Sequence, residues 1–158
     1  MSRPGARFGA HPTEPKLNAP TPQQVADAMH ARDHAARALD IQIVAVNLGS
    51  ATVSMRVRQD MVNGHDICHG GYMALLCDTA FAYACNSYNL NAVASGFSIE
   101  ILAPATLGDT LVAVGVEQAQ RGRQGVYDIK LTNQNGDVIA LFRGKSTRIA
   151  GEVISTTT

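Results

Sequence analysis

The alternation of apolar and polar positions predicts one amphipathic helix, two strands, a long buried helix and then four more strands. The first helix should begin at Thr21, because Thr21, Pro22 and Gln24 suit a capping residue, the first helical position and the third residue of a capping box. We expect this single helix to lie on another layer of the structure. Its recurring positions, spaced by three or four residues, are Val25, Met29, Arg32, Ala36 and Leu39.

Strand signals flank the long helix on both sides. Gly49-Ser50 separates two runs of alternating residues, which predicts a hairpin with one solvated face. The last three runs are joined by short connections rich in glycine and asparagine, which predicts an antiparallel meander, since no crossover helix fits there. The predicted strands are 41–48, 52–58, 93–102, 109–117, 126–132 and 138–142.

The long helix is apolar on almost every side, and Asp78 is the only charged residue between Tyr72 and Ala84. Such a helix must be enclosed, and a strongly curved antiparallel sheet of about six strands can enclose it. The pattern therefore predicts an α+β fold in which the sheet wraps the central helix. A buried carboxylate is costly unless it is neutralised, hydrogen-bonded or facing a cleft, so Asp78 is either a functional group or a structural carboxylate that caps backbone.

Composition narrows the classes of function. The 158 residues include 13 basic and 13 acidic side chains, so no net charge favours a nucleic acid or membrane partner. The absence of a membrane-spanning run and of a signal-peptide pattern leads us to expect a cytoplasmic protein. We expect residues 1–20 to be a flexible arm, 21–150 one domain and 151–158 a flexible tail. The three cysteines, which we expect to be reduced and mainly buried, are Cys68, Cys77 and Cys85.

The turn before the long helix offers a site for a negative charge. His69-Gly-Gly71 opens the helix, where unpaired N–H groups meet the positive end of the helix dipole. Glycine also lets a ligand carbonyl approach the backbone closely. His65, Asp66, Cys68 and His69 are metal-ligand types, but they are crowded together without the spacing of a tetrahedral site, so we expect neither a metal nor a cofactor. A thiol nucleophile at Cys68 is a further alternative.

Two motifs resemble those of the hotdog-fold acyl-CoA thioesterases. Asn63-Gly-His-Asp-Ile-Cys-His69-Gly-Gly71 is followed, nine residues after His69, by Asp78. Later in the chain, Leu102-Ala-Pro104 precedes Gly108-Asp-Thr-Leu111. The resemblance covers roughly residues 38–149, leaves the N-terminal arm outside, and implies the hotdog fold.

Three further stretches, Asp78–Ser87, Gly125–Ile129 and Ala140–Ser146, are similar to the branch of this family that acts in phenylacetic acid degradation. That branch implies hydrolysis of phenylacetyl-CoA and its ring-hydroxylated relatives. Asp78 would act there as general base or as nucleophile, two roles that the sequence does not separate.

Residue by residue, the resemblance makes Asp78 the catalytic carboxylate and Gly70 the backbone donor to the thioester carbonyl, with His69 and Asn63 completing the site. Ser95 lies near the position where some relatives orient the attacking water. Among aromatic and apolar residues, Tyr72, Met73, Phe81 and Tyr83 are candidates for the acyl pocket, although residues at such helical spacing are more often part of the core. The remaining candidates are Gly71 near the substrate, and Arg143 and Lys145 for the CoA phosphates, with Arg121, Arg123 and Arg148 as further basic residues.

Spacing has a consequence for assembly. On one straight helix Gly70 and Asp78 would lie about 12 Å apart along the axis. If both act on one thioester, each site must take Gly70 from one chain and Asp78 from another. We therefore expect at least a homodimer, which the resemblance extends to a homotetramer made of two dimers, with acyl-CoA as the substrate.

Two other functions stay open on the same fold. One is a non-catalytic module that binds or senses acyl-CoA. The other is an enoyl-CoA hydratase, whose hotdog relatives pair the aspartate with a histidine farther along the helix, whereas no histidine follows His69 in this chain. That difference favours hydrolysis.

Overall fold

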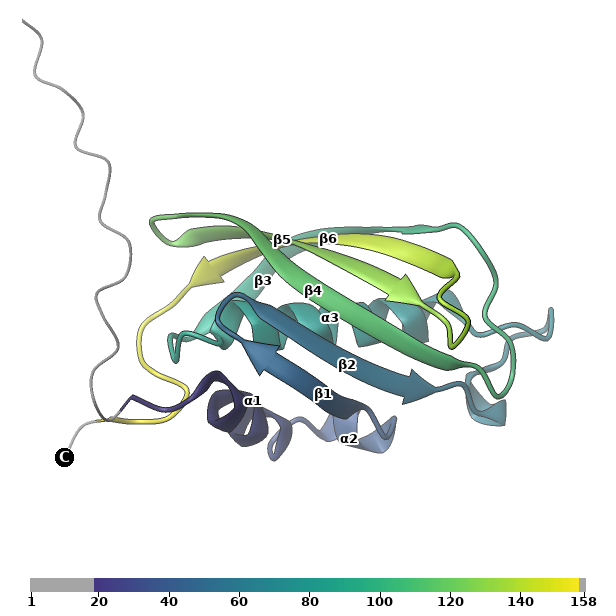
Figure 1. The fold of residues 1–158 in the computed structure, drawn as a ribbon, viewed down its shortest axis with the longest axis horizontal. Helices are drawn as coiled ribbons and strands as arrows, with labels where there is room; N and C mark the ends of the chain where they lie inside the picture. Colours follow the sequence, from purple (N-terminus) through teal and green to yellow (C-terminus); the bar gives the residue numbers. More distant parts are fainter. Residues whose placement is uncertain (1–18, 157–158) are drawn as a thin grey trace, which may run out of the picture.

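The computed structural model describes residues 19–156, and Figure 1 labels the elements in this range. They are α1 (Pro22–His30), α2 (His34–Ala38), β1 (Gln42–Asn47), β2 (Ser50–Arg56), a short 3₁₀ turn η1 (Gln59–Met61), α3 (Gly70–Asn86), β3 (Ala92–Ile101), β4 (Thr110–Arg121), β5 (Gln124–Thr132) and β6 (Val138–Arg148). The predicted order of elements is confirmed, except that the N-terminal helix is divided in two.

All six strands form one antiparallel sheet in the order β1-β2-β4-β5-β6-β3. The predicted hairpin (β1 and β2) and meander (β4 to β6) are both present. The sheet curves around α3, while α1 and α2 lie along the side of α3 near β1 (Figure 1). This is the predicted α+β arrangement, in which β1 and β3 are left as the two edge strands.

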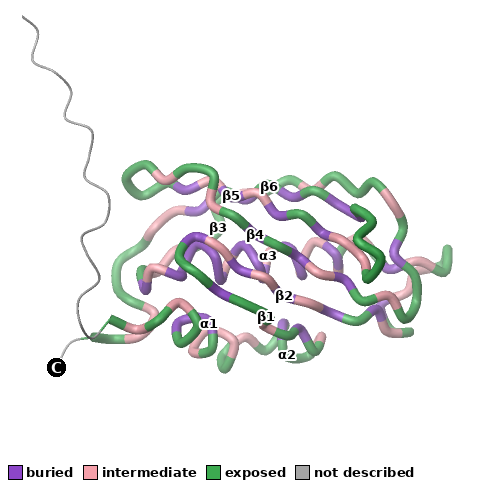
Figure 2. Tube along the Cα trace, in the orientation of Figure 1, coloured by how far each residue is buried: buried purple, intermediate pink, exposed green. Residues whose placement is uncertain are grey.

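The core is the space between α3 and the concave face of the sheet (Figure 2). Phe81 lies at its centre, with its ring 5.6 Å from that of Tyr127 and 6.2 Å from that of Phe142, measured between centroids. A Cβ added to Gly144 of β6 would come within 2.8 Å of the Phe81 ring, so the sheet needs a glycine there. The buried α3 residues are Met73, Leu76, Cys77, Thr79, Ala80, Phe81, Tyr83, Ala84, Cys85 and Asn86.

The prediction of one continuous N-terminal helix is wrong. The predicted start at Thr21 is correct, with the complete capping box, but α1 ends at His30. A second cap then starts α2, because the Asp33 side chain accepts a hydrogen bond of 2.9 Å from the Ala36 backbone N–H. Arg32, which fitted the apolar spacing, lies exposed at the break.

Several strands run beyond their predicted ends. β6 continues past Phe142 to Arg148, and β4 continues past Glu117 to Arg121. In β6 the inward positions of this extension are Gly144 and Ser146, which are buried but small, so the sequence lacks the large apolar residues that normally reveal a strand.

The predicted limits of the domain, with an arm at 1–20 and a tail at 151–158, remain predictions. Of the predicted N-terminal arm, only Ala19 and Pro20 lie within the described residues. In the predicted tail, the backbone N–H and C=O of Ile154 each make a hydrogen bond of 2.9 Å with the Asn89 side chain. Across residues 19–156 no helix combines the length and apolar character needed to cross a bilayer.

Candidate functional site

The start of α3 is fixed by the loop before it. The Cys68 backbone N–H donates to the Ala105 carbonyl at 2.7 Å, and the His69 N–H donates to the Met61 carbonyl at 2.8 Å. The His69 ring then caps the helix, since its Nδ1 accepts from the Gly71 N–H at 3.3 Å. The backbone of His69 is thus fixed by Met61, and its side chain caps the first turn of α3.

These hydrogen bonds do not involve the backbone N–H of Gly70. Within residues 19–156 it has no hydrogen-bond acceptor, and Gly70 is half-buried at the positive end of the helix. A Cβ built on Gly70 would meet only the Ile101 Cδ1, at 3.0 Å. The predicted donor site is therefore open to an oxygen atom of a ligand.

Asn63 shapes the exposed loop that leads to this turn. Its Oδ1 accepts from the His65 N–H at 2.8 Å, and its backbone N–H donates to the Ile67 carbonyl at 2.9 Å. Asp66 adopts a left-handed conformation, with φ of 59°, to close the turn. The Asn63 side-chain amide, which has no acceptor among the described residues, is left as a second donor.

The Gly108-Asp109 motif stabilises the same loop through hydrogen bonds. Asp109 Oδ2 accepts from the Thr106 N–H at 2.7 Å and its hydroxyl at 3.1 Å, and Oδ1 accepts from the Gln134 side chain at 2.9 Å. These hydrogen bonds lower the pKa of Asp109, that from the Thr106 backbone most strongly. Thr106 in turn pairs with Ile67. Gly108 and Asp109 therefore have a structural role, which the family resemblance in the sequence did not indicate.

Asp78 lies midway along α3, half-buried, with no hydrogen bond or ion pair to any residue of the range 19–156. Burial raises the pKa of its carboxyl, and the negative charge of Asp33 raises it further. A carboxyl in this state is available for proton transfer closer to neutral pH than an ordinary aspartate. The sequence does not identify Asp33 as a site residue. The one sequence signal for it is that aspartate is a common helix cap and that Asp33 stands just before α2.

Asp78 belongs to the one stripe of α3 that the rest of the chain leaves partly open. Ala74, Leu75, Asp78 and Ala82 recur at three- and four-residue spacing and none is fully buried. Gly70 lies in the same straight helix, about 12 Å from Asp78 along the axis. The donor and the carboxylate of one chain are therefore too far apart to touch one carbonyl group.

Edge strand β3 runs beside this stripe in the opposite direction to α3. Ile101 lies next to Gly70, and the Asn86 side chain hydrogen-bonds Ala92, so Asp78 is level with the middle of β3. Ser95 sits there in a bulge, and its hydroxyl donates to the Lys145 carbonyl at 3.1 Å. The structure thus brings two predicted substrate contacts, Ser95 and Lys145, together.

Three of the other basic candidates, Arg143, Arg123 and Arg148, already interact with other groups of the chain. Arg143 makes two hydrogen bonds to Asp128 across β5 and β6, at 2.6 and 2.7 Å, which lower the pKa of Asp128. Arg123 donates to the Arg148 carbonyl at 2.8 Å, and the Arg148 guanidinium lies 5.5 Å from the centre of the Tyr88 ring.

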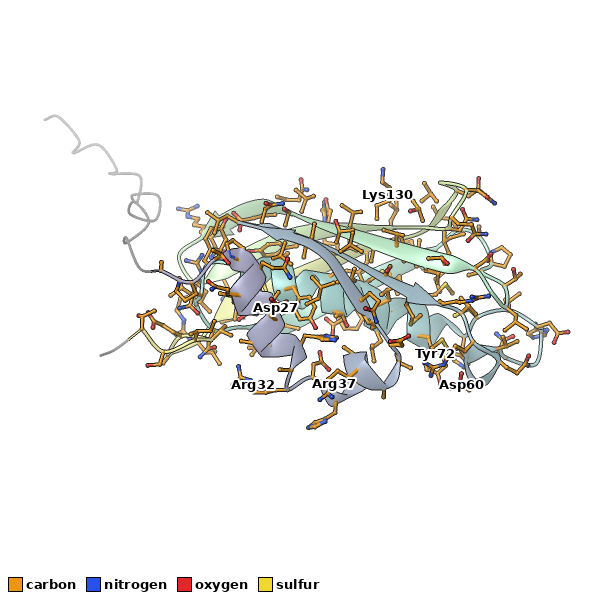
Figure 3. The ribbon with its side chains drawn as sticks, turned by 60° about the horizontal axis from the view of Figure 1, so that its bottom comes forward. Asp27, Arg32, Arg37, Asp60, Tyr72 and Lys130 are labelled. Atoms are coloured by element: carbon orange, nitrogen blue, oxygen red, sulfur yellow. The ribbon has the colours of Figure 1, made fainter. Side chains whose placement is uncertain are left out.

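Most aromatic and apolar candidates are core residues. Met73 and Phe81 are buried, and Tyr83 is buried with its hydroxyl 2.9 Å from His30 Nδ1, which fastens α1 to α3. Tyr72 is half-buried in the first turn of α3, where its hydroxyl donates to the Asp60 carbonyl at 3.4 Å (Figure 3). Tyr72 alone of the four borders the open start of the helix.

The cysteines are free and buried. Burial raises the pKa of Cys68 to about 11, so its thiol stays protonated at neutral pH and makes a poor nucleophile. Among residues 19–156 no three His, Cys, Asp or Glu side chains gather closely enough to hold a metal ion.

Comparison with known proteins identifies the family of this chain. Residues 65–140 match the family model of the thioesterase superfamily. The chain is 50% identical over 130 residues to the acyl-coenzyme A thioesterase PaaI of Escherichia coli strain K12, which covers 82% of this chain and 93% of that protein.

Solved structures give the same result. The structure of the E. coli PaaI protein from the phenylacetic acid degradation operon matches with a TM-score of 0.82 and 50% identity, over 83% of this chain and 95% of that one. The Streptococcus mutans protein smu.793, solved with bound acetyl CoA, matches with a TM-score of 0.68 and 27% identity, over 71% and 90% of the two chains. The chain therefore belongs to the thioesterase superfamily and has the hotdog fold of its PaaI relatives.

Proposed function

We propose that this protein hydrolyses acyl-CoA thioesters, with phenylacetyl-CoA and its ring-hydroxylated relatives as substrates. The name of the E. coli relative, its origin in the phenylacetic acid degradation operon and the acetyl CoA bound to the streptococcal relative all support the proposal. The three free, buried cysteines accord with a reducing compartment, so we also propose a cytoplasmic location.

One observation carries the proposal. Within residues 19–156, neither the backbone N–H of Gly70 nor the carboxylate of Asp78 has a hydrogen-bond partner, and the two groups lie about 12 Å apart along α3. Hydrolysis of a thioester needs both a donor for the developing oxyanion and a group that activates water. Because one chain cannot direct both groups at the same carbonyl, we propose that two copies form each site, with Gly70 from one and Asp78 from the other.

In this site Asp78 accepts a proton from water as the water oxygen attacks the thioester carbon. The carbonyl oxygen becomes negative and accepts a hydrogen bond from the Gly70 N–H. When the tetrahedral intermediate collapses, the carbon–sulfur bond breaks and the sulfur of CoA takes up the proton from Asp78. The products are the free acid and CoA. Direct attack by Asp78, through a mixed anhydride, is the alternative; turnover in heavy-oxygen water, followed by mass analysis of the Asp78 peptide, separates the two.

Edge strand β3 supports a particular mode of pairing. It is ten residues long, and no strand of the described part of the chain pairs with its outer side. Three of its apolar side chains, Val93, Phe97 and Ile101, are 48%, 51% and 47% exposed. A long apolar edge of this kind readily pairs with another strand. We propose that β3 pairs antiparallel with β3 of a second copy about a two-fold axis, which lays the open stripe of α3 against its counterpart.

The convex face of the sheet supports the proposed tetramer. Val114, Val116 and Leu141 are 38%, 45% and 47% exposed on that face. Two dimers could bury these residues against each other. Of the basic candidates, Lys145 is better suited than Arg143 to bind CoA phosphate, because Arg143 is already paired with Asp128 and Lys145 lies beside the bulge at Ser95.

The test is a panel of acyl-CoA thioesters assayed by release of free thiol, run beside the Asp78→Asn variant. We expect aryl-acetyl thioesters to be turned over fastest and the variant to bind substrate without turnover. Sedimentation velocity over a concentration series would accompany the assay. A fully active monomer, or unchanged turnover in the variant, would remove the proposed site.

A further inference from the structure

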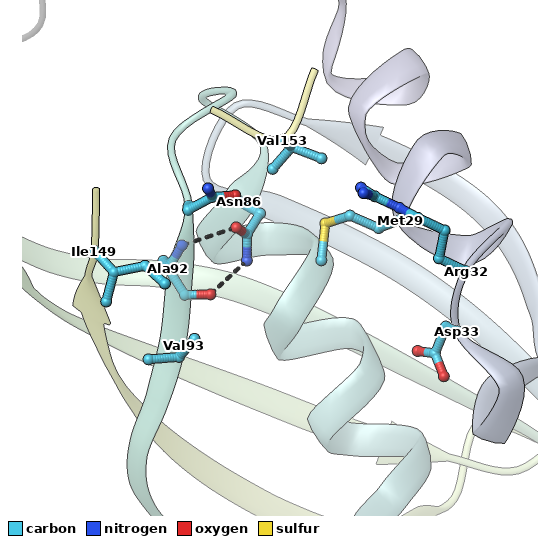
Figure 4. Close-up of a pocket in the computed structure, with 9 residues that line it drawn as sticks. Met29, Arg32, Asp33, Asn86, Ala92, Val93, Ile149 and Val153 are labelled. Carbon is cyan, nitrogen blue, oxygen red and sulfur yellow. Dashed lines mark hydrogen bonds between the residues drawn. The ribbon is translucent and has the colours of Figure 1, made fainter. Parts of the chain in front are cut away.

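A groove of about 330 Å³ lies at the far end of α3 from Gly70. Figure 4 shows it between α1 on one side and the start of β3 on the other, with the segment after β6 along its edge. Its apolar lining consists of Met29, Ala92, Val93, Ile149 and Val153. Val93 and Ile149 are nearly half exposed in one chain, and since Val93 also lies on the β3 edge that we propose pairs with a second copy, the groove borders that interface.

The groove leads away from the proposed catalytic carboxylate. Asp78, Ala82 and Asn86 follow one another at four-residue spacing and so share one face of α3. Asn86 lines the groove, and so does Asp33, whose charge acts on Asp78. The groove therefore lies on the same side of α3 as Asp78, where the acyl group of a substrate held at Asp78 can extend toward it.

The polar side chains of the groove differ in how many of their hydrogen-bonding groups are already used within the chain. The Asn86 amide is fully used, since it bonds both the N–H and the C=O of Ala92. The Asn91 amide donates to the Ala150 carbonyl at 3.2 Å. Arg32 is different: its Nε donates to the Ala28 carbonyl, but no carboxylate in the range 19–156 lies within ion-pair distance of its guanidinium. Arg32 is therefore the positively charged donor available in the groove.

On the basis of the proposed function, we propose that this groove binds the acyl portion of the thioester, and that Arg32 selects acyl groups whose apolar body ends in an oxygen acceptor, either a hydroxyl or a carboxylate. The body of the acyl group lies against Met29, Val93 and Val153. The terminal nitrogens of the Arg32 guanidinium donate to the distal oxygen. Arg32 is thereby a residue that determines specificity and takes no part in the hydrolysis itself.

The kinetic test compares three thioesters of equal chain length: hexanoyl-CoA, ω-hydroxyhexanoyl-CoA and adipyl-CoA. Arg32→Met should lower kcat/KM about tenfold for the two oxygenated substrates, because each loses a charge-assisted hydrogen bond. Hydrolysis of hexanoyl-CoA should be unchanged. Arg37→Met is the matched control, since Arg37 is also exposed and also donates to a backbone carbonyl, that of Ala31 just after α1, but does not line the groove (Figure 3). The two oxygenated arms reveal whether a hydroxyl or a carboxylate is preferred.

A binding test does not depend on activity. The chain contains no tryptophan, so Val153→Trp introduces a single tryptophan in the wall of the groove, whose emission can be excited separately from that of the four tyrosines. In the Asp78→Asn background, hexanoyl-CoA and adipyl-CoA should change its emission saturably, whereas CoA alone should not. Leu48→Trp, in the exposed turn between β1 and β2, is the control and should respond to neither.

The outcomes separate this proposal from the proposed function. If the protein hydrolyses thioesters but Arg32→Met affects all three substrates alike, or none of them, the role of Arg32 is refuted while the activity stands. The groove is refuted as the acyl site if CoA alone changes the tryptophan emission, or if neither acyl-CoA thioester changes it. If no thioester is hydrolysed but the tryptophan responds to acyl-CoA and not to CoA, the groove stands and the proposed hydrolysis fails.

Discussion

Replacing Gly70 by alanine should separate catalysis from folding. The Cα–Cβ bond of a helical residue tilts toward the N-terminus of the helix, so the new methyl group would crowd the space in front of the free Gly70 N–H. Only the Ile101 Cδ1 lies close to that methyl position, at 3.0 Å, and it is the end of a flexible, half-exposed side chain. The helix itself favours alanine over glycine by about 0.5–1 kcal/mol, which offsets the contact with Ile101.

The expected effect is therefore large on turnover and small on stability. Loss of one oxyanion donor costs roughly 2.7–4 kcal/mol of transition-state stabilisation, or about 10²- to 10³-fold in kcat. The melting temperature should move by less than about 4 °C, since about 1 kcal/mol shifts a domain of this size by that amount at most. Thiol release and thermal denaturation measure the two quantities. Gly64→Ala is the control, because a Cβ there meets nothing within 4 Å. If Gly70→Ala turns over as fast as Gly64→Ala, the backbone donor is misassigned.

Three other substitutions test the account. Asp78→Asn should lower kcat by about 10²- to 10⁴-fold yet stabilise the fold at neutral pH. Burial raises the pKa of Asp78 in the folded state, so the native protein binds the proton more tightly than the unfolded chain. Wild-type stability, relative to the variant, should accordingly fall as pH rises from the ordinary aspartate value of 3.8 through the native pKa, which paired denaturant titrations would measure; equal stability at all pH values would contradict the burial of charge. His69→Ala should cost about 0.5–2 kcal/mol of stability, and His69→Asn less, because asparagine can also cap the helix; identical losses would argue against capping by His69. Phe81→Ala should cost about 3–5 kcal/mol in urea denaturation, and Gly144→Ala should be better tolerated in a Phe81→Leu background; simple additivity would show that the two residues do not compete for space.

The features that could be predicted from the sequence were those with a local cause. The long apolar run identified α3, and His69-Gly-Gly71 identified its start, since both the cap and the glycines act within one turn. The resemblance to the hotdog thioesterases pointed to the correct family. The break between α1 and α2 was missed because apolar spacing continues across it, while the cap at Asp33 acts over only three residues.

Features that depend on contacts between distant residues could not be predicted. The pairing of Arg143 with Asp128 follows from the register of β5 and β6, which no local pattern sets. The same is true of the bond between Ser95 and Lys145 across β3 and β6, and of the influence of Asp33 on Asp78. In each case the two residues are far apart in the sequence, and only the folded chain brings them together.

A mixing experiment tests the shared site most directly. Gly70→Ala and Asp78→Asn proteins, each inactive alone, are unfolded together, refolded and assayed for thiol release. If each site takes Gly70 from one chain and Asp78 from the other, half of the randomly formed dimers contain one intact site, and activity should return to about a quarter of the wild-type value. If both residues serve a site within a single chain, every site carries one defect and the mixture stays as inactive as its components.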